Sequence, residues 1–496
     1  MQHSIPFQLL RRVSFWLALV ACSASALAQT ATTAPAANKR ATSHIQSINS
    51  GAFFQMQTAI GDDYFDGRDS RARVRRHLRV AKELGVGSLR CAFSWNGIQP
   101  QHDRYDFVFW DMLVDEAARA GIKLIPYVAY TPEWAARNKT EFWKQPPRDP
   151  ALFAAVMTKL ATRYRGRIHS WELWNEPDLN EYWQGSADEF AELVIAGAKA
   201  VHLADPDARI VLGGMSRGPG PFFETLVSKY QIGSFVDVIA LHGYPESWDE
   251  ERAEEVFLKR IPEMKRLTDR SGGKPELWLN EMGYADYRYR PNQASVWGTN
   301  TYYRYEHSQR YAADFLLKSF IMTAVSGQIT LAGWYRIDDF LHTDRRMPAD
   351  KVHYHLGVQN VNGARKPSFK AFRFFNKLFA QRVRTADQDA NVHRAAASQS
   401  VVHAFERKDG KLVIAGWLRS SEYDEVPQHT GFAVDSRAER ISVGLPCTAS
   451  TVTNYNALGH AVSHTHPYTQ SLRNVRLTGD RVFVAVVDCA KPKPIN

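Results

Sequence analysis

The chain has 496 residues, of which 44% are hydrophobic and 23% are charged. These proportions are typical of a folded globular protein and exclude disorder over most of the length. The length is too great for one ordinary core and suits a large barrel with an accessory domain. A net charge of +10, without a long Lys/Arg block, argues against a nucleic-acid-binding protein.

The first 28 residues resemble an export signal. Arg11 and Arg12 precede the apolar run VSFWLALVA, which is about half as long as a membrane span and is followed by small residues. Two cleavage sites compete. ALA before Gln29 fits ordinary secretion, whereas LVAC ending at Cys22 resembles a bacterial lipoprotein box, in which Cys22 would be lipidated and anchored to a membrane. Both predict an exported bacterial protein that is periplasmic, outer-membrane-anchored or extracellular.

Residues 29–44, QTATTAPAANKRATSH, are rich in Ala, Thr and Pro and predict a flexible linker. From residue 45 to residue 381, predicted strands alternate with amphipathic helices. The strands, in chain order, are SGAFFQM, GSLRCAFSW, IKLIPYVAY, IHSWELWN, ARIVLGG, VDVIALHGY, PELWLNEMGY and ITLAGWYRI. The helices between them include FVFWDMLVDEAARAG, PALFAAVMTKLATRYRG and residues 187–204, 221–230, 251–270 and 307–326, and PSFKAFRFFNKLFA closes the region.

Nearly continuous apolar strands that alternate with helices predict a parallel sheet covered by helices. About eight such units fit a closed (β/α)8 TIM barrel. A doubly wound open sheet is the alternative, but no G-x-G-x-x-G turn follows any of the strands. Residues 382–496 contain shorter alternating strands, among them SVVHAFERKDGKLVIAGWLR and DRVFVAVVD, and predict a β-sandwich that serves carbohydrate binding or supports the barrel.

The four cysteines divide into three kinds. Cys22 belongs to the signal, and Cys91 lies in an apolar strand and predicts an inert buried thiol. Cys447 and Cys489 share the C-terminal region and predict a disulfide in an oxidising compartment. No Cys/His cluster has metal-ligand spacing, so we predict no metal or other cofactor. The acidic run GDDYFDGRDS lacks the calcium-loop pattern and predicts a helix cap at its end.

Two glutamates stand at predicted strand ends, where the active site of such a barrel forms. Glu176 follows IHSWELWN, Glu281 follows ELWLN, and each comes directly after an asparagine. A single glutamate there is more often a cap or an ion-pair partner. Two of them among tryptophans indicate the pair of carboxylates that glycosidic bond cleavage needs, one protonated and one ionised. Pro177 disfavours the helical conformation at Glu176, so we expect the strand to stop and the carboxyl to project into the barrel mouth.

The motif Trp174-Asn175-Glu176-Pro177, followed about a hundred residues later by LWLNEMGY, resembles the clan A retaining glycoside hydrolases. In that clan the acid/base follows strand four and the nucleophile follows strand seven, which are the positions of Glu176 and Glu281 in the predicted strand order. The chain is most similar to family 39, which includes β-xylosidases, iduronidase and bacterial exopolysaccharide hydrolases. The segment HLGVQNVNGARKPSFKAF also resembles that family's last barrel turn. The resemblance covers about residues 50 to 380.

The resemblance implies that Glu176 is the general acid/base and Glu281 the nucleophile, and that Arg90 matches the strand-two arginine. Arg90 would keep Glu281 ionised through a charge-assisted hydrogen bond, although a structural ion pair with Glu172 is the alternative. The Asn175 amide would bind a sugar hydroxyl.

His242 and Tyr244 match the strand-six pair that orients the nucleophile or binds sugar, unless they are core residues. Trp334 matches the strand-eight platform under the sugar ring, after which a cis peptide is common in the clan. Trp95 either stacks on the ligand or belongs to the core. Asn280 departs from the Thr or Ser often found before the nucleophile.

These residues predict an exported retaining glycoside hydrolase that cleaves an extracellular bacterial polysaccharide or oligosaccharide. Arg288, Arg290 and Arg304 alternate with tyrosines and predict either a solvated loop or a lip that attracts an anionic polymer. An exo-acting β-xylosidase-like enzyme, with residues 285–306 blocking one end of the groove, is an alternative, as are an inverting glycosidase and a non-catalytic carbohydrate-binding barrel. No G-x-S-x-G, Cys-His or H-E-x-x-H motif indicates another class of hydrolase.

Overall fold

The computed structural model describes residues 52–64, 67–248, 251–287, 305–341, 351–419, 437–479 and 481–490. The predicted signal at 1–28, the linker at 29–44 and the arginines at 288, 290 and 304 lie outside these residues, as does most of the predicted insertion at 285–306. In the described part of the chain, no helix combines the length and the apolar character that a membrane span requires.

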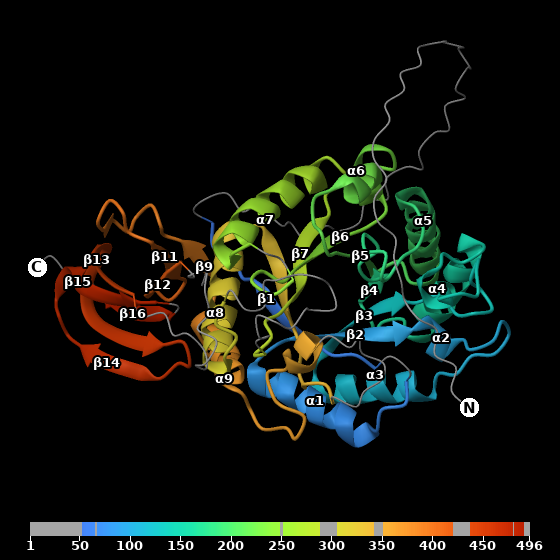
Figure 1. Cartoon of the computed structure of the whole chain (residues 1–496), viewed down its shortest axis with the longest axis horizontal. Coiled ribbons are helices and arrows are strands. Elements are labelled where there is room, and N and C mark those ends of the chain that lie inside the picture. Colours follow the sequence, from blue (N-terminus) through green and yellow to red (C-terminus); the bar gives the residue numbers. More distant parts are fainter. Residues whose placement is uncertain are drawn as a thin grey trace, which may run out of the picture. The chain divides into compact units, whose positions relative to one another are not determined.

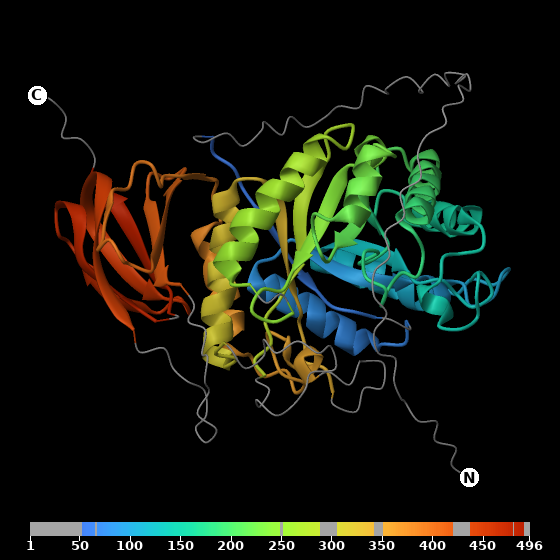
Figure 2. The same ribbon diagram turned by 45° about the horizontal axis from the view of Figure 1, so that its top comes forward.

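Eight parallel strands close into a barrel in sequence order, as predicted, and β1 pairs with both β2 and β8. Figures 1 and 2 show these strands surrounded by helices. The strands are β1 (Gln57–Gly61), β2 (Ser88–Ser94), β3 (Lys123–Ala129), β4 (Ser170–Leu173), β5 (Arg209–Met215), β6 (Val238–Gly243), β7 (Glu276–Met282) and β8 (Ile329–Tyr335).

Nine α-helices lie in the described residues, most of them where the apolar periodicity places them. They are α1 (Arg71–Leu84), α2 (Trp95–Ile98), α3 (Val108–Ala120), α4 (Pro150–Arg163), α5 (Ala187–Ala204), α6 (Pro221–Ser228), α7 (Ala253–Asp269), α8 (Gln309–Ser326) and α9 (Pro367–Leu378). Short 3-10 turns are η1 (Phe142–Lys144), η2 (Ile232–Ser234) and η4 (Lys351–His355).

Local sequence signals set the ends of the helices. Ser70 caps α1 by accepting a hydrogen bond from the Arg73 amide, which confirms the cap predicted at the end of the acidic run. Ser186 and Glu189 form a reciprocal capping box at the start of α5. The helices α4, α6 and α9 begin with proline, which has no amide hydrogen to leave unpaired in the first turn.

Two hydrophobic layers hold the barrel. The smaller fills its interior and draws one or two side chains from most of the strands, namely Ala59, Ile125, Val211, Val238, Ala240, Trp278 and Leu331. The larger lies between the strands and the surrounding helices. Because both faces of each strand are buried, the strands read as continuous apolar runs in the sequence.

The position predicted for the first strand is wrong. Barrel strand β1 is Gln57–Gly61, whereas the prediction placed it at SGAFFQM, a few residues earlier. In that earlier segment Phe54 instead bridges Val383, with hydrogen bonds of 2.7 and 2.8 Å. Both segments are apolar enough to form a strand, and only β1 has β2 and β8 on either side to pair with.

The C-terminal region is an antiparallel sheet, as predicted for a β domain. Its strands are β9 (Val383–Thr385), β10 (Val392–His393), β11 (Ser400–Arg407), β12 (Leu412–Leu418), β13 (Ala438–Asn456), β14 (Ala461–Thr465), β15 (Thr469–Thr478) and β16 (Phe483–Cys489). The long strand β13 pairs with β15 mainly through its first half and with β16 through its second half. Strands β12 and β15 do not pair, yet both contribute to one core, so the sheet folds over through β13.

The sheet packs on the barrel through shared apolar side chains and polar contacts. Trp417 and Val484 belong to the same hydrophobic cluster as the barrel helices. The Val482 amide donates to the buried carboxylate of Asp314 on α8 at 2.8 Å. Within the sheet, the predicted disulfide between Cys447 and Cys489 is confirmed, with 5.7 Å between the Cα atoms.

Candidate active site

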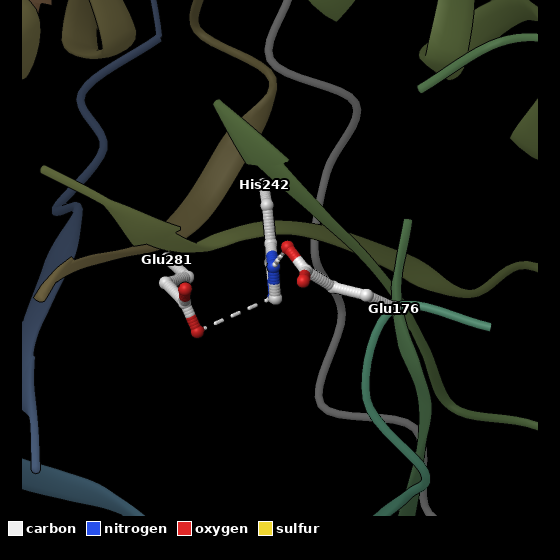
Figure 3. A group of neighbouring side chains, drawn as sticks. All are labelled: Glu176, His242 and Glu281. Carbon is white, nitrogen blue, oxygen red and sulfur yellow. Dashed lines mark hydrogen bonds and ion pairs between the residues drawn. The ribbon is translucent and has the colours of Figure 1, made fainter. Parts of the chain in front are cut away.

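Glu176 and Glu281 converge at the mouth of the barrel, where the carboxyl ends of the strands meet. Glu176 lies three residues beyond the end of β4, and Glu281 is the next-to-last residue of β7. The His242 ring from β6 stands between them (Figure 3), with Nδ1 2.8 Å from Oε1 of Glu176 and Nε2 3.9 Å from Oε2 of Glu281. One oxygen of each carboxylate and the imidazole all lie within 4.8 Å of one another. The two predicted carboxylates therefore face one common space.

An unusual backbone aims Glu176 into the mouth. β4 ends at Leu173, and both Trp174 (φ 80°) and Glu176 (φ 46°) take the left-handed conformation, which bulky side chains rarely adopt. Pro177 keeps Glu176 out of the right-handed helical region, as predicted. Trp174 is fully buried against Tyr130 and Trp183, and this packing fixes the turn.

Two glycines of β5 make room for this turn. A Cβ atom on Gly213 would come within 2.8 Å of the carbonyl oxygens of Leu173 and Trp174. A Cβ atom on Gly214 would lie 2.0 Å from Nε2 of His242. The Gly214 carbonyl also accepts a hydrogen bond from the Glu176 amide at 3.1 Å. Residues 213 and 214 must therefore lack side chains for Glu176 and His242 to hold their positions.

Arg90 links the two sides of the mouth. Its guanidinium donates to Oε2 of Glu281 at 2.6 Å and binds both oxygens of Glu172 at 2.7 and 2.9 Å. Both predicted partners of Arg90 are thus present. Asn280 donates to Glu172 at 3.0 Å, so the asparagine that departs from the clan pattern supports Arg90 through Glu172.

Tyr244 and Asn175 complete the contacts around the pair. The Tyr244 hydroxyl donates to Oε1 of Glu281 at 2.5 Å. The Asn175 side chain accepts from Arg90 at 2.7 Å and donates to the Tyr130 hydroxyl at 3.3 Å. Because Arg90 and Tyr244 bind different oxygens of Glu281, the orientation of that carboxylate is fixed.

The surroundings drive the pKa values of the two carboxyls in opposite directions. Burial raises the pKa of Glu176, and the hydrogen bond and charge of His242 offset this only in part. Burial also acts to raise the pKa of Glu281, but the charges of His242 and Arg90 and the hydrogen bonds from Tyr244 and Arg90 outweigh it, so this pKa is lowered. One carboxyl therefore holds its proton to higher pH than usual, while the other stays ionised to lower pH than usual.

Two groups of side chains in the described residues have the donor types of a metal site. In the first, Glu176, His242 and Glu281, the imidazole already bonds one carboxylate directly. In the second, Asp286, Asp339 and His355, the Lys366 ammonium binds the two aspartates at 2.9 and 2.7 Å and supplies the positive charge itself. Both groups are held together by contacts within the protein.

The structure places Trp334 and Trp95 in the core, so the sugar-platform role predicted for Trp334 is wrong, and of the two alternatives for Trp95 the core position is the one found. Trp334 is 1% exposed and packs against Phe315 and Phe320 of α8, between the strands and the helices. Trp95 is completely buried against Phe153, and its indole donates to Gln99. A cis peptide does lie near Trp334, between Tyr335 and Arg336.

The sequence analysis missed a third carboxylate in the mouth. Asp63, two residues after β1, accepts hydrogen bonds from the hydroxyls of Tyr127 on β3 and Tyr335 on β8, at 2.7 and 2.6 Å. Burial raises its pKa. The Tyr127 ring also lies 4.5 Å from the Arg90 guanidinium. The position of Asp63 two residues after a barrel strand is the signal that could have found it, had the first strand been placed correctly.

A (β/α)8 barrel with glutamates after β4 and near the end of β7 has the architecture of the clan A glycoside hydrolases. The model of the family described as glycosyl hydrolases family 39 matches residues 67–417. The chain therefore belongs to glycosyl hydrolase family 39, which confirms the resemblance seen in the sequence.

Individual relatives are distant. The β-xylosidase of Caldicellulosiruptor saccharolyticus is 23% identical over 307 residues, which are 58% of this chain and 59% of that protein. The β-xylosidase of Geobacillus stearothermophilus is 24% identical over 55% of this chain and 56% of its own length. The chain thus spans little more than half the length of the curated relatives it matches.

Solved structures of the family share the fold. A family 39 glycoside hydrolase from Bacteroides cellulosilyticus WH2 superposes with a TM-score of 0.64 at 14% identity, over 88% of this chain and 81% of that one. A family 39 β-xylosidase from Caulobacter crescentus gives a TM-score of 0.57 at 18% identity, over 88% and 96%. At these identities the likeness extends to the fold alone.

Proposed function

We propose that the protein is a retaining glycoside hydrolase in which Glu176 is the general acid/base and Glu281 the nucleophile. The observation that carries this proposal is the pair of facing carboxyls with opposite pKa shifts, bridged by one imidazole. Glycosidic cleavage needs one carboxyl protonated and one ionised at the same pH, and the opposite directions of the two pKa shifts favour that combination.

In the first step, Glu176 gives its proton to the glycosidic oxygen while a carboxylate oxygen of Glu281 attacks the anomeric carbon. The bond from that carbon to the leaving oxygen breaks, the alcohol departs, and a glycosyl ester of Glu281 remains. Arg90 and Tyr244 hold Glu281 so that one oxygen can be directed at the sugar. The raised pKa of Glu176 keeps the required proton available.

In the second step, Glu176, now ionised, takes a proton from water while the water oxygen attacks the anomeric carbon. The ester bond breaks, Glu281 is regenerated as a carboxylate, and the sugar leaves with its original anomeric configuration. The charge of His242 acts on both carboxyls, so it couples the proton on Glu176 to the ionisation of Glu281.

The separation of the carboxyls favours retention over inversion. Retaining enzymes place them about 5–5.5 Å apart, whereas inverting enzymes leave about 6.5–9.5 Å for a water molecule. Here one oxygen of Glu176 and one oxygen of Glu281 lie within 4.8 Å of each other, which is shorter than the separation of the two carboxyl groups as wholes. This close approach agrees with direct attack by Glu281.

The roles are tested by Glu176→Gln and Glu281→Gln, with Glu263→Gln on the exposed side of α7 as a matched control. Each site variant should fold normally and lose at least about 1,000-fold in kcat, since each removes a group that acts on the reacting bond. With an activated aryl glycoside, azide should restore turnover to Glu176→Ala, because azide attacks the glycosyl ester of Glu281 in place of water without needing a general base and releases a glycosyl azide. Full activity in Glu281→Gln would refute the assignment.

For the substrate we propose an extracellular bacterial polysaccharide or oligosaccharide. The apolar segment with a cleavage motif at the N-terminus supports export of the protein, with or without a lipid on Cys22. The names of the two curated relatives favour a second candidate, the hydrolysis of β-xylosides. A panel of polysaccharides, oligosaccharides and aryl glycosides, screened with the wild type and Glu176→Gln, distinguishes them. Binding without turnover across the panel would indicate a carbohydrate-binding barrel instead.

A further inference from the structure

Three aromatic side chains gather beside Glu176 and have no part in the proposed chemical steps. They form the β3–β4 aromatic cluster (Tyr130, Trp143 and Tyr182). Tyr130 directly follows β3, Trp143 lies in η1, and Tyr182 lies in the segment after β4. The Tyr130 and Tyr182 rings are 5.9 Å apart and inclined by only 16°, and Trp143 meets Tyr130 edge-on at 5.6 Å.

Trp143 in this cluster is exposed to solvent. Trp143 is 36% exposed, whereas every other tryptophan of the described residues is buried or half-buried. About a third of the Trp143 surface is therefore open to solvent and can be covered by a ligand. Tyr130 and Tyr182 are half-buried and continue the cluster from Trp143 towards the barrel mouth.

The loops that carry the cluster are fixed to each other. Lys144 donates to Glu141 at 2.6 Å, and its ammonium lies 5.1 Å from the Trp143 ring. The backbone amide of Gln184 donates to the Lys144 carbonyl at 2.8 Å, and the side chain of Gln145 donates to the side-chain oxygen of Gln184 at 2.6 Å. Trp143 is therefore held in place before any ligand arrives, which lowers the entropy cost of binding.

The cluster lies on the Glu176 side of the site. The Tyr130 hydroxyl accepts a hydrogen bond from Asn175, the residue before Glu176. Burial and then the charge of Glu176 raise the pKa values of both Tyr130 and Tyr182, which agrees with this proximity. The acid/base gives its proton to the leaving oxygen, so whatever is bonded to that oxygen lies on the side of Glu176.

We propose that the β3–β4 aromatic cluster binds a sugar ring on the leaving-group side of the scissile bond. The substrate is then a glycan with carbohydrate on both sides of that bond, rather than a sugar joined to a small alcohol. The apolar C–H face of a pyranose packs on an aromatic ring, and the tyrosine hydroxyls can bond its edge. This inference rests on the proposed function, because it uses Glu176 as the acid that marks the leaving-group side.

The test compares a substrate that has a leaving-group sugar with one that has none. Xylotetraose and β-D-xylosyl fluoride are used first, because two relatives are named β-xylosidases. If the substrate panel selects another sugar, its tetrasaccharide and its fluoride replace them. Fluoride departs without a ring, so it reports the chemistry at Glu281 without the cluster.

Trp143→Ala should lower kcat/KM for the tetrasaccharide about tenfold, mostly through KM, and leave the value for the fluoride within twofold of wild type. Trp143→Phe keeps a flat ring and should recover most of the loss. Tyr468→Ala removes another exposed aromatic, in the loop between β14 and β15, and should change neither value. An unchanged tetrasaccharide value, or an equal loss on both compounds, would overturn the proposal.

The same measurements distinguish a failure of the proposed function from a failure of the leaving-group site. A wild-type protein that hydrolyses no glycoside of the panel overturns that function and this inference together. A wild type that hydrolyses both compounds, with Trp143→Ala behaving like it, overturns the leaving-group site alone.

Discussion

The close contact between His242 and Gly214 allows a test of how His242 sets the pKa values of Glu176 and Glu281. In the variant Gly214→Ala, the new Cβ atom would lie 2.0 Å from Nε2 of His242 and 2.4 Å from Cδ2. Ordinary contact begins near 3.4 Å, so the ring must move by about 1.4 Å, the difference between 3.4 and 2.0. Such a shift breaks the 2.8 Å hydrogen bond between Nδ1 and Glu176.

The expected loss of activity is large and the loss of stability is moderate. A displacement of about 1 Å at catalytic groups can cost about 100-fold in rate. Overpacking by one methyl group costs about 1–3 kcal/mol of unfolding free energy. We therefore expect kcat to fall about 100-fold while the variant remains folded at 25 °C, as measured by denaturant unfolding.

The direction in which the pH profile of Gly214→Ala shifts tests the role of His242 most directly. His242 lowers the pKa of Glu281 and opposes the raised pKa of Glu176, so moving it away raises both values. Activity requires Glu281 ionised and Glu176 protonated, and both limbs of the kcat/KM profile should therefore shift to higher pH. Gly220→Ala is the control, because a Cβ atom there meets nothing within 4 Å. A Gly214→Ala variant with the wild-type rate and pH profile would refute this account of His242.

Two further substitutions test other parts of the structure. Lysine in Arg90→Lys keeps the charge but lacks the planar guanidinium that binds both oxygens of Glu172 while it donates to Glu281, so we expect kcat/KM to fall at least about tenfold. The acid limb of its pH profile should move to higher pH, because Glu281 loses a hydrogen bond that lowers its pKa. An unmoved acid limb would contradict this role. Trp417→Phe removes the 2.7 Å hydrogen bond to Glu254, a residue only 2% exposed, and should cost about 1–3 kcal/mol in denaturant unfolding without changing kcat. Unchanged stability would show that this contact contributes nothing.

The sequence was sufficient to predict the barrel and to bring Glu176 and Glu281 together. Strand order alone puts both residues at one end of a parallel barrel, and the Asn-Glu steps draw attention to them. The contact of Arg90 with Glu281 was implied by the resemblance to the clan A glycoside hydrolases, as was that of Tyr244 as one of its alternatives. Whether His242 would lie between the carboxyls did not follow, because that depends on the distance across the mouth.

The predictions that failed concern the face of a strand towards which a side chain points. In the β8 sequence ITLAGWYRI, Trp334 and the next residue, Tyr335, point to opposite faces, and Tyr335 is the one that reaches Asp63. A strand buried on both faces has no polar alternation to show which residue points inward. The need for glycine at 213 and 214, and the gathering of Tyr130 with Trp143, arise from contacts between distant segments that no local pattern contains.

The hydrophobic cluster shared by α8, α9 and the C-terminal sheet has a consequence for how the protein can be divided. A protein truncated after residue 381 would lose Phe405, Trp417 and Val484 from a core that the barrel helices also use. Asp314 on α8 would lose the hydrogen bond that its carboxylate accepts from the Val482 amide. We therefore expect the barrel and the C-terminal sheet to unfold in one transition, and a barrel separated from the sheet to be less stable than the whole chain.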